Sequence, residues 1–490
     1  MKRKLQFLLC AGTVLAVTPL QAETLRDALT QAYVTNPTLT GARAGQRATD
    51  EAVPIAKAQG RPDASGTASY TELLPRSDGQ NFSPNRLLSG RVDLSVPIYT
   101  GGAVKNGVFA AQNRVQAGQA GLRATESAIF SAVVGVYMDV IRDESIVELN
   151  RAQVGVLQVN LEATKDRFEI GDLTRTDVAQ SEARLQLAIS NMEGARSNLI
   201  RSKEIYIQLV GDVPGDLEAP PPLPNLPNTP DDAVKVALDA NPDLIAAREF
   251  REAAAFDRRG ANASRLPQVA GFTSGSYSNN FGSIDPGTSP IPGSITVPVP
   301  DKSNSSAQIG IRATIPLYSG GQPAAQIRQA QARLGQAQEQ EIAAEREAIA
   351  QTRASYAGWR ASLQVIAASE RAVSANELSL EGTRAENSVG NRTILDILNA
   401  EQELLQSKVQ LVTARRNAYV AGFSLLAAMG KAEARDLGLE GGALYDPMTN
   451  YDAVEDAWND WSTRADPATE ATRTVDTPAQ KAEIEPLPDY

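Results

Sequence analysis

The fold is decided by a short stretch that occurs twice, first as Val96-Pro97-Ile98-Tyr99-Thr100-Gly101-Gly102. The second occurrence is Ile315-Pro316-Leu317-Tyr318-Ser319-Gly320-Gly321, and the prolines are separated by 316 − 97 = 219 residues. Two later pairs of glycines keep this spacing, namely Gly171 with Gly390 and Gly211 with Gly430. A shift that holds without a gap over this distance indicates a duplicated unit whose elements are fixed in length.

A long helix pattern follows each Gly-Gly pair. The sequence from Ala103 to Val213 contains no proline, and small, apolar and helix-favouring residues dominate it. At 1.5 Å per residue, the residues between Gly102 and Ile170 predict a rod about 100 Å long. Gly171 suits the left-handed end of this helix, and a second helix then returns. The sequence thus predicts two long helical hairpins, over 102–211 and 321–430.

A strand pattern precedes each Gly-Gly pair. Apolar or small residues alternate with polar ones at Leu88, Gly90, Val92, Leu94, Val96 and Ile98. The second copy alternates in the same way, which predicts strand hairpins over 62–98 and 267–317. Strands of about ten residues can cross a bilayer when tilted, although alternation alone favours an ordinary soluble hairpin. Four strands cannot close by themselves in lipid, so a spanning sheet would require several chains.

The remaining landmarks divide the chain. Asn36-Pro37 and Asn241-Pro242 each follow a short amphipathic helix pattern, and the stretch from 214 to 230 is rich in proline. A basic start followed by an apolar core predicts a signal peptide. The expected organisation is a signal peptide over 1–22, a first repeat over 23–213, a linker over 214–230, a second repeat over 231–430, a C-terminal segment packing on the helices over 431–461 and a disordered tail over 462–490.

Composition excludes several classes of function. The formal net charge of the 490 residues is −11, which argues against a nucleic-acid partner. There is no histidine, and the sole cysteine, Cys10, lies in the predicted signal peptide. Most acid–base and zinc sites use these residues, so we expect neither an enzyme nor a cofactor or metal site. After the signal segment, the chain has no apolar run long enough to predict a membrane-spanning helix.

The order and spacing of these motifs resemble the TolC-like outer-membrane efflux protein family. The run from Ser388 to Ala400, with both Gly-Gly turns and both Asn-Pro pairs, carries the resemblance over about 23–430. It implies an α+β membrane protein built from two tandem repeats. In this fold a homotrimer shares an outer-membrane β-barrel, with four strands per chain. A long periplasmic α-helical barrel continues it.

The resemblance also implies a function and its partners. Family members are outer-membrane exit ducts of tripartite efflux or type I secretion systems, gated at the periplasmic end. They conduct drugs, small molecules or proteins passively, and they dock with a periplasmic adaptor and an inner-membrane transporter of the RND or ABC type. The alternative is a periplasmic adaptor or structural coiled-coil protein without a pore.

Two groups of residues match family positions that control the periplasmic entrance. In relatives, residues matching Thr176 and Asp177 bond an arginine matching Arg392 and form a latch; Asn387 stands where the family has a tyrosine. Asp396 matches one acidic ring of the entrance, and Asn399 replaces the other. The alternative is purely structural, because Asp177 and Asp396 each lie three residues after a threonine, as in a capping box.

The tips of the helical hairpins match the adaptor-contacting part of the family. The residues concerned are Gly171 and Asp172 in the first hairpin, and Gly390 and Asn391 in the second. These glycines are equally well suited to ending a helix.

Overall fold

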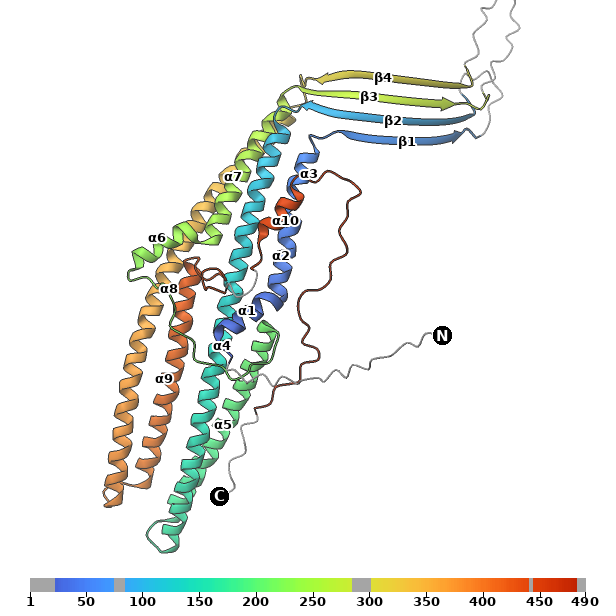
Figure 1. The fold of residues 1–490 in the computed structure, drawn as a ribbon. Coiled ribbons are helices and arrows are strands. Elements are labelled where there is room, and N and C mark those ends of the chain that lie inside the picture. The colour runs from blue at the N-terminus through green and yellow to red at the C-terminus, as the bar shows by residue number, and fades with distance from the viewer. Residues whose placement is uncertain (1–22, 75–83, 284–300, 440–443, 483–490) are drawn as a thin grey trace, which may run out of the picture.

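The computed structural model describes residues 23–74, 84–283, 301–439 and 444–482. The predicted signal peptide lies outside these ranges, as do parts of the loops within both strand hairpins. The molecule is elongated, with a sheet at one end and long helices that run away from it (Figure 1).

Four antiparallel strands form one sheet in the order β1-β2-β3-β4. The strands are β1 (Asp63–Glu72), β2 (Arg86–Tyr99), β3 (Gln268–Asn279) and β4 (Ser303–Thr314). The two hairpins join through β2 and β3, whose register shifts between Pro97 and Tyr99. β4 ends before the predicted limit at residue 317, close to Pro316, which has no N–H to donate to a strand ladder.

Among the described residues, β1 and β4 are the two edges of this sheet. Several large apolar side chains on its strands are exposed, including Val92 at 63%, Ile309 at 87% and Ile311 at 73%. An exposed apolar sheet with two open edges is a surface that normally requires a partner or a membrane.

Two long helical hairpins continue the sheet. They are formed by α4 (Ala103–Glu169) with α5 (Arg175–Val210), and by α8 (Gln322–Ser388) with α9 (Ile394–Ala428). Both α4 and α8 contain 67 residues, and they begin 322 − 103 = 219 residues apart. At about 1.5 Å per residue, each of these helices is about 100 Å long.

Short helices pack on the long helices between the sheet and the middle of the molecule (Figure 1). They are α1 (Leu25–Thr35), α2 (Pro37–Asp50), α3 (Ala52–Ala58), α6 (Pro230–Ala240), α7 (Pro242–Asn262), the 3-10 turn η1 (Ala263–Arg265) and α10 (Pro447–Val454). The largest apolar cluster lies around the middle of α4 and includes Phe130, Tyr137, Tyr206 and Phe423. The hydroxyl of Tyr137 donates to the carbonyls of Glu23 and Glu218, which fixes the start of the described chain to α4.

Among the described helices, α4 is long and apolar enough to cross a membrane by length and composition alone, although the sequence predicts no such span. Within its apolar window, 44% of the residues are buried inside the chain. Phe130, Val133 and Tyr137 of α4 belong to the central apolar cluster, so the hydropathy of this helix reflects its packing against other helices.

The C-terminal segment packs on the helices near the sheet. Asn450 of α10 donates to Asp50 of α2, and Lys57 of α3 pairs with Asp456 at 2.7 Å. Beyond it, residues 463–482 form no helix or strand. The backbone N–H of Gln480 donates to Glu204 of α5, and Thr472 lies against Gly211. These contacts hold the tail along α5 even though its composition is polar.

The two Asn-Pro pairs have the same structural role. Asn36 and Asn241 each cap the helix that follows, and each side-chain amide donates across to the end of a long hairpin. The acceptors are the carbonyl of Leu209, at 2.9 Å, and the carbonyl of Ala428, at 3.0 Å. Proline then suits the first helical position.

Replacing Asn241 should weaken the packing of the short helices α6 and α7 against the end of the long helix α9. We expect Asn241→Ala to destabilise the protein by about 1–3 kcal/mol, because it removes a helix cap and leaves the Ala428 carbonyl with only the longer, 3.5 Å hydrogen bond from the Thr352 hydroxyl. Thermal unfolding followed by circular dichroism in detergent measures the effect. Asn262→Ala, at an exposed position on α7, is the control and should change little.

Candidate functional site

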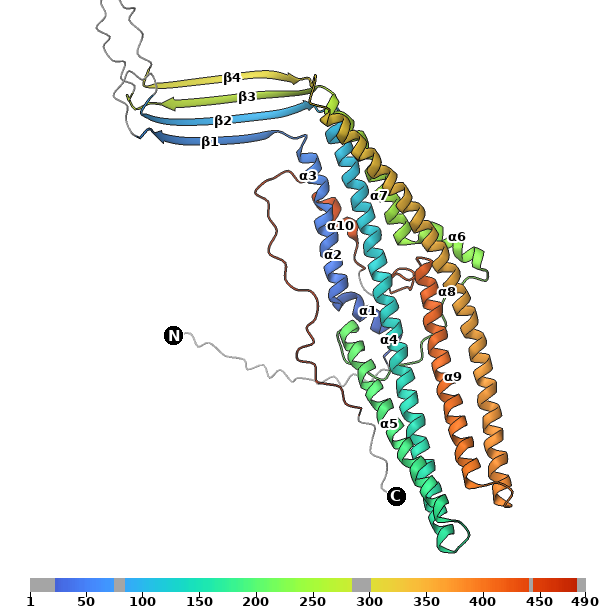
Figure 2. The same cartoon turned by 180° about the vertical axis from the view of Figure 1, so that it is seen from behind.

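The ends of the two helical hairpins lie farthest from the sheet (Figure 2). In each loop a glycine follows the long helix with positive φ, +83° at Gly171 and +81° at Gly390. A Cβ at either position would meet no neighbouring atom within 4 Å. Glycine is therefore favoured there by the positive φ of the backbone and not by a lack of space for a side chain. Asp172 and Asn391 close these turns, with their N–H groups bonded to the carbonyls of Arg167 and Glu386.

Both returning helices begin with a complete capping box. Thr174 donates to Asp177 at 2.7 Å, and Thr393 donates to Asp396 at 2.8 Å. Hydrogen bonds from the Thr174 hydroxyl and backbone hold the pKa of Asp177 below its ordinary value of 3.8. The Thr393 backbone and hydroxyl lower the pKa of Asp396 in the same way. Both carboxylates therefore stabilise the first turn of a helix.

Arg392 does not form the predicted latch within this chain. In the described residues it pairs with Glu386, with Nε 2.7 Å from Oε2, while Asp177 accepts from Thr174. The side-chain amide of Asn387 donates to the backbone carbonyl of Arg392 at 2.7 Å. Glu386 lies on the same tip as Arg392, whereas Thr176 and Asp177 lie on the other hairpin, which explains the different pairing.

The two hairpins meet above their tips, where α9 lies against α4 and α5. Leu398 is 1% exposed and is the α9 member of a buried apolar cluster in the described chain. The other members are Val154, Leu157, Leu161, Leu185, Ala188 and Met192. Asn399, expected only as a substitution in the entrance ring, accepts from Arg184 of α5 at 2.8 Å. Gln402 also accepts from Arg184.

A buried carboxylate completes this contact. Glu401 is 2% exposed, and its two oxygens accept from the amide of Asn160 on α4 at 3.0 and 3.1 Å. Arg384 of α8 donates to the same carboxylate at 2.9 Å. No motif in the sequence pointed to this buried carboxylate. The available signal was periodicity, since Glu401 shares one helical stripe with the apolar Ile397 and Leu404.

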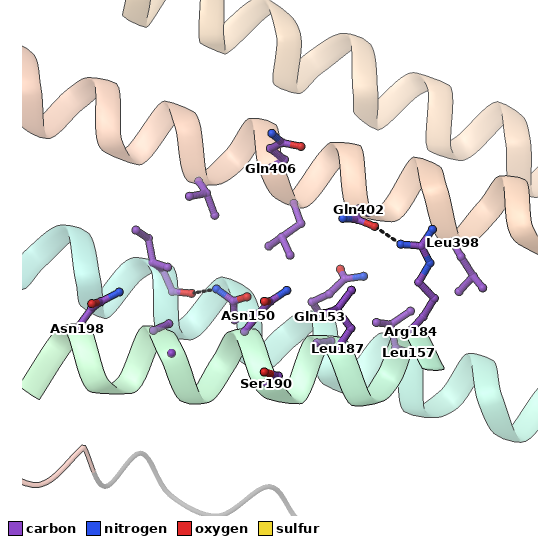
Figure 3. Close-up of a pocket in the computed structure, with 17 residues that line it drawn as sticks. Asn150, Gln153, Leu157, Arg184, Leu187, Ser190, Asn198, Leu398, Gln402 and Gln406 are labelled. Carbon is purple, nitrogen blue, oxygen red and sulfur yellow. Dashed lines mark hydrogen bonds between the residues drawn. The ribbon is translucent and has the colours of Figure 1, made fainter. Parts of the chain in front are cut away.

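A cavity of about 470 Å³ lies beside this contact, between α4, α5 and α9 (Figure 3). Arg184 crosses one end of it to reach Gln402, and Leu398 lies next to them. The lining is mostly uncharged and includes the polar side chains of Asn150, Gln153, Ser190, Asn198 and Gln406. In the ranges that the structure describes, no group of three or more carboxylate, cysteine or histidine side chains is placed to hold a metal ion.

An ion pair joins the two hairpins closer to the sheet. Arg416 of α9 donates to Asp139 of α4 at 3.0 Å, and its Nε lies 2.8 Å from the other oxygen without being aligned for a hydrogen bond. Arg142 also pairs with Asp139, at 2.6 Å. This network fixes α9 to α4 near the central cluster, so the two hairpins are joined by charges at two levels.

An open strand sheet continued by two helical hairpins of this length defines an outer-membrane channel fold. The family description "Outer membrane efflux protein" matches residues 28–211 and 233–431, and the chain belongs to this family. The predicted resemblance and the outer-membrane location are thereby confirmed. The family consists of transport ducts and is not a family of enzymes.

Individual relatives agree with this assignment. The chain is 33% identical over 450 residues to the outer membrane efflux protein BepC of Brucella suis, covering 92% of this chain and 94% of that protein. It is 26% identical over 441 residues to TolC of Vibrio cholerae, covering 89% and 97%. The solved structure of VceC from Vibrio cholerae has the same fold, with a TM-score of 0.69 at 22% identity over 83% of this chain and 96% of VceC.

The capping boxes predict that the stability of the first turns of α5 and α9 depends on pH. The lowered pKa values of Asp177 and Asp396 mean that each carboxylate stabilises its helix start above pH 3.8, and that this contribution is lost as pH falls through the folded-state pKa. We expect hydrogen exchange in the tip peptides, corrected for intrinsic rates, to increase between about pH 6 and about pH 3. Asp177→Asn and Asp396→Asn should remove the increase, each in its own tip. Equal pH dependence in both variants and the parent chain would contradict this role.

Proposed function

We propose that this chain is one third of a homotrimeric exit duct that crosses the outer membrane and extends into the periplasm. The observation that carries the proposal is the four-stranded sheet whose β1 and β4 edges are open in the described chain. In lipid, each unpaired backbone group costs several kcal/mol, so an open sheet is not a stable spanning structure.

Three copies remove this difficulty. Joining β1 of one chain to β4 of the next gives 3 × 4 = 12 strands in a closed barrel, an even number within the range of outer-membrane barrels. Exposed Val92, Ile309 and Ile311 would then supply apolar surface for lipid. The tandem hairpins, related by the 219-residue shift, would supply twelve helices to a tube about 100 Å long.

The duct would be passive and would depend on partners. We propose that it carries drugs, other small molecules or proteins in a tripartite efflux or type I secretion system. It would dock through the tips around Gly171, Asp172, Gly390 and Asn391 with a periplasmic adaptor, and through it with an inner-membrane transporter of the RND or ABC type. The family membership and the full-length match to BepC support this proposal.

Assembly and conduction test the duct directly. Unheated samples from outer-membrane fractions should run as a trimer in detergent gels and as a monomer after boiling. The purified protein should form discrete channels in planar bilayers. A periplasmic monomer without channel activity would overturn the duct and favour the adaptor or coiled-coil alternative.

The entrance latch is proposed between neighbouring chains. Arg392 is half-exposed and Thr176 is exposed, so both remain accessible to another copy. In the trimer, Arg392 of one chain would exchange its Glu386 partner for Asp177 of the next, near Thr176 and Asn387. Three copies of Asp396 would form a single acidic ring that attracts cations, with the neutral Asn399 above it.

Removing either latch partner should open the entrance. We expect Arg392→Ser and Asp177→Ala to raise single-channel conductance roughly twofold or more, because each removes a charge-assisted hydrogen bond that opposes opening. Arg175→Ser changes the same charge at an exposed position of the neighbouring tip and serves as the control. Conductance equal to that of the parent chain in both latch variants would overturn the latch while leaving the duct intact.

A further inference from the structure

Two tryptophans near the C-terminus have highly exposed side chains. Trp458 is 81% exposed and Trp461 is 92% exposed, and both lie beyond residue 431, where the match to the family description ends. The chain has three tryptophans, and the third, Trp359 of α8, is partly buried against an apolar cluster that includes Leu425 of α9. Two large aromatic side chains exposed this close together indicate a surface that another molecule or a membrane covers.

Local hydrogen bonds hold the backbone around these tryptophans. The carbonyl of Ala457, directly before Trp458, accepts from the guanidinium of Arg61. Asn459 lies between the two tryptophans, and its side chain accepts from the backbone N–H of Trp461 at 3.0 Å. An asparagine that accepts from the N–H two residues later closes a tight turn. Both rings therefore project from a turn with a defined backbone.

This turn lies beside the end of the sheet from which the helices continue. Arg61, which donates to Ala457, lies two residues before Asp63, the first residue of β1. Lys57 of α3 pairs with Asp456 at 2.7 Å on the other side of the same contact. Figure 1 shows the chain after α10 running beside α3 and below β1. Two extended residues span about 7 Å, so the turn is held close to the start of a strand.

The boundary of the outer membrane falls at this end of the sheet in the proposed duct. Tyr99 ends β2 and Tyr318 follows β4, and these tyrosines are 49% and 89% exposed at the same end. Tyrosine and tryptophan favour the boundary between hydrocarbon and water, because the ring is apolar while the O–H or N–H group stays hydrated. Trp458 and Trp461 thus lie at the level where this boundary is expected.

The turn faces outward in the proposed trimer. The short helix α3 holds it, and three sets of short helices would obstruct the tube if they lay inside it. The charges beside the turn are largely compensated, because Glu455 and Asp456 both pair with Lys57. Asp460, between the tryptophans, is exposed and does not favour anionic lipid. The two rings are therefore the main attraction, and a zwitterionic phospholipid surface fits them.

We propose that Trp458 and Trp461 form a membrane anchor whose rings insert among the headgroups of the periplasmic leaflet, outside the barrel. This inference rests on the proposed duct, since only the assembled trimer places the turn against lipid. The anchor fixes the C-terminal segment at the bilayer surface. Through Arg61 and Lys57 it also holds the start of β1 at a constant depth.

Tryptophan fluorescence tests the anchor in the assembled protein. In Trp359→Phe, all indole emission comes from Trp458 and Trp461. In phosphatidylcholine nanodiscs this emission should fall roughly twofold or more when the lipid carries bromine on acyl carbons near the headgroup, because bromine quenches indole on contact and the rings lie at that depth. The water-soluble quencher acrylamide should quench this emission less than that of free N-acetyltryptophanamide.

The matched control retains Trp359 as the only tryptophan, through the double substitution Trp458→Phe and Trp461→Phe. Trp359 lies 359 − 322 = 37 residues after the first residue of α8. At 1.5 Å per residue this is about 55 Å from the sheet end of the helix, so brominated lipid should leave its emission unchanged. Heat-sensitive trimers and channels in planar bilayers verify that both variants assemble.

The results separate the anchor from the duct. Quenching by brominated lipid in Trp359→Phe, with none in the control, supports the anchor. Conducting trimers whose two exposed tryptophans are quenched by acrylamide alone overturn the anchor and leave the duct standing. Quenching by neither reagent means that protein covers the rings, for example in a neighbouring copy, and this also overturns the anchor. A parent chain that forms no trimer overturns the duct and the anchor together.

Discussion

The unpaired backbone N–H and C=O groups along the outer edges of β1 and β4 are the constraint on which the proposed assembly depends. Water can satisfy them in a soluble protein, but hydrocarbon cannot. A sheet of four strands must then find its missing neighbours in other copies of the same chain. This requirement also sets where the long helices lie around the proposed tube. Each of α4 and α8 begins a few residues after the end of a strand, β2 and β4 respectively, so the position of the strand in the barrel determines the position of the helix (Figure 1).

Local sequence predicts much of this architecture because its signals act over a few residues. Glycines with positive φ end α4 and α8, threonines cap α5 and α9, and the Asn-Pro pairs separate the short helices. The end of β4 was predicted less well, since alternation continues through Ile315 and Leu317 while Pro316 interrupts the ladder.

The candidate site was predictable in position but not in pairing. The motifs identified both tips and both capping boxes, whereas the partner of Arg392 within the chain is Glu386. Glu401 was missed for a related reason. Its burial requires α4 from the other half of the chain to lie beside α9, and a helical stripe cannot reveal which helix covers it. Contacts between distant segments depend on tertiary packing, which a single sequence encodes only indirectly.

The equal lengths of α4 and α8 limit how this protein can change over evolutionary time. Losing one heptad from both α8 and α9 would raise the tip of this hairpin by about 10 Å relative to the tip of α4 and α5, and the proposed rim would then be uneven. No adaptor with matched tips could then seat evenly on it. Insertions and deletions should therefore occur together in both helices of both hairpins, so we expect the height of the tube to vary among relatives in coordinated steps.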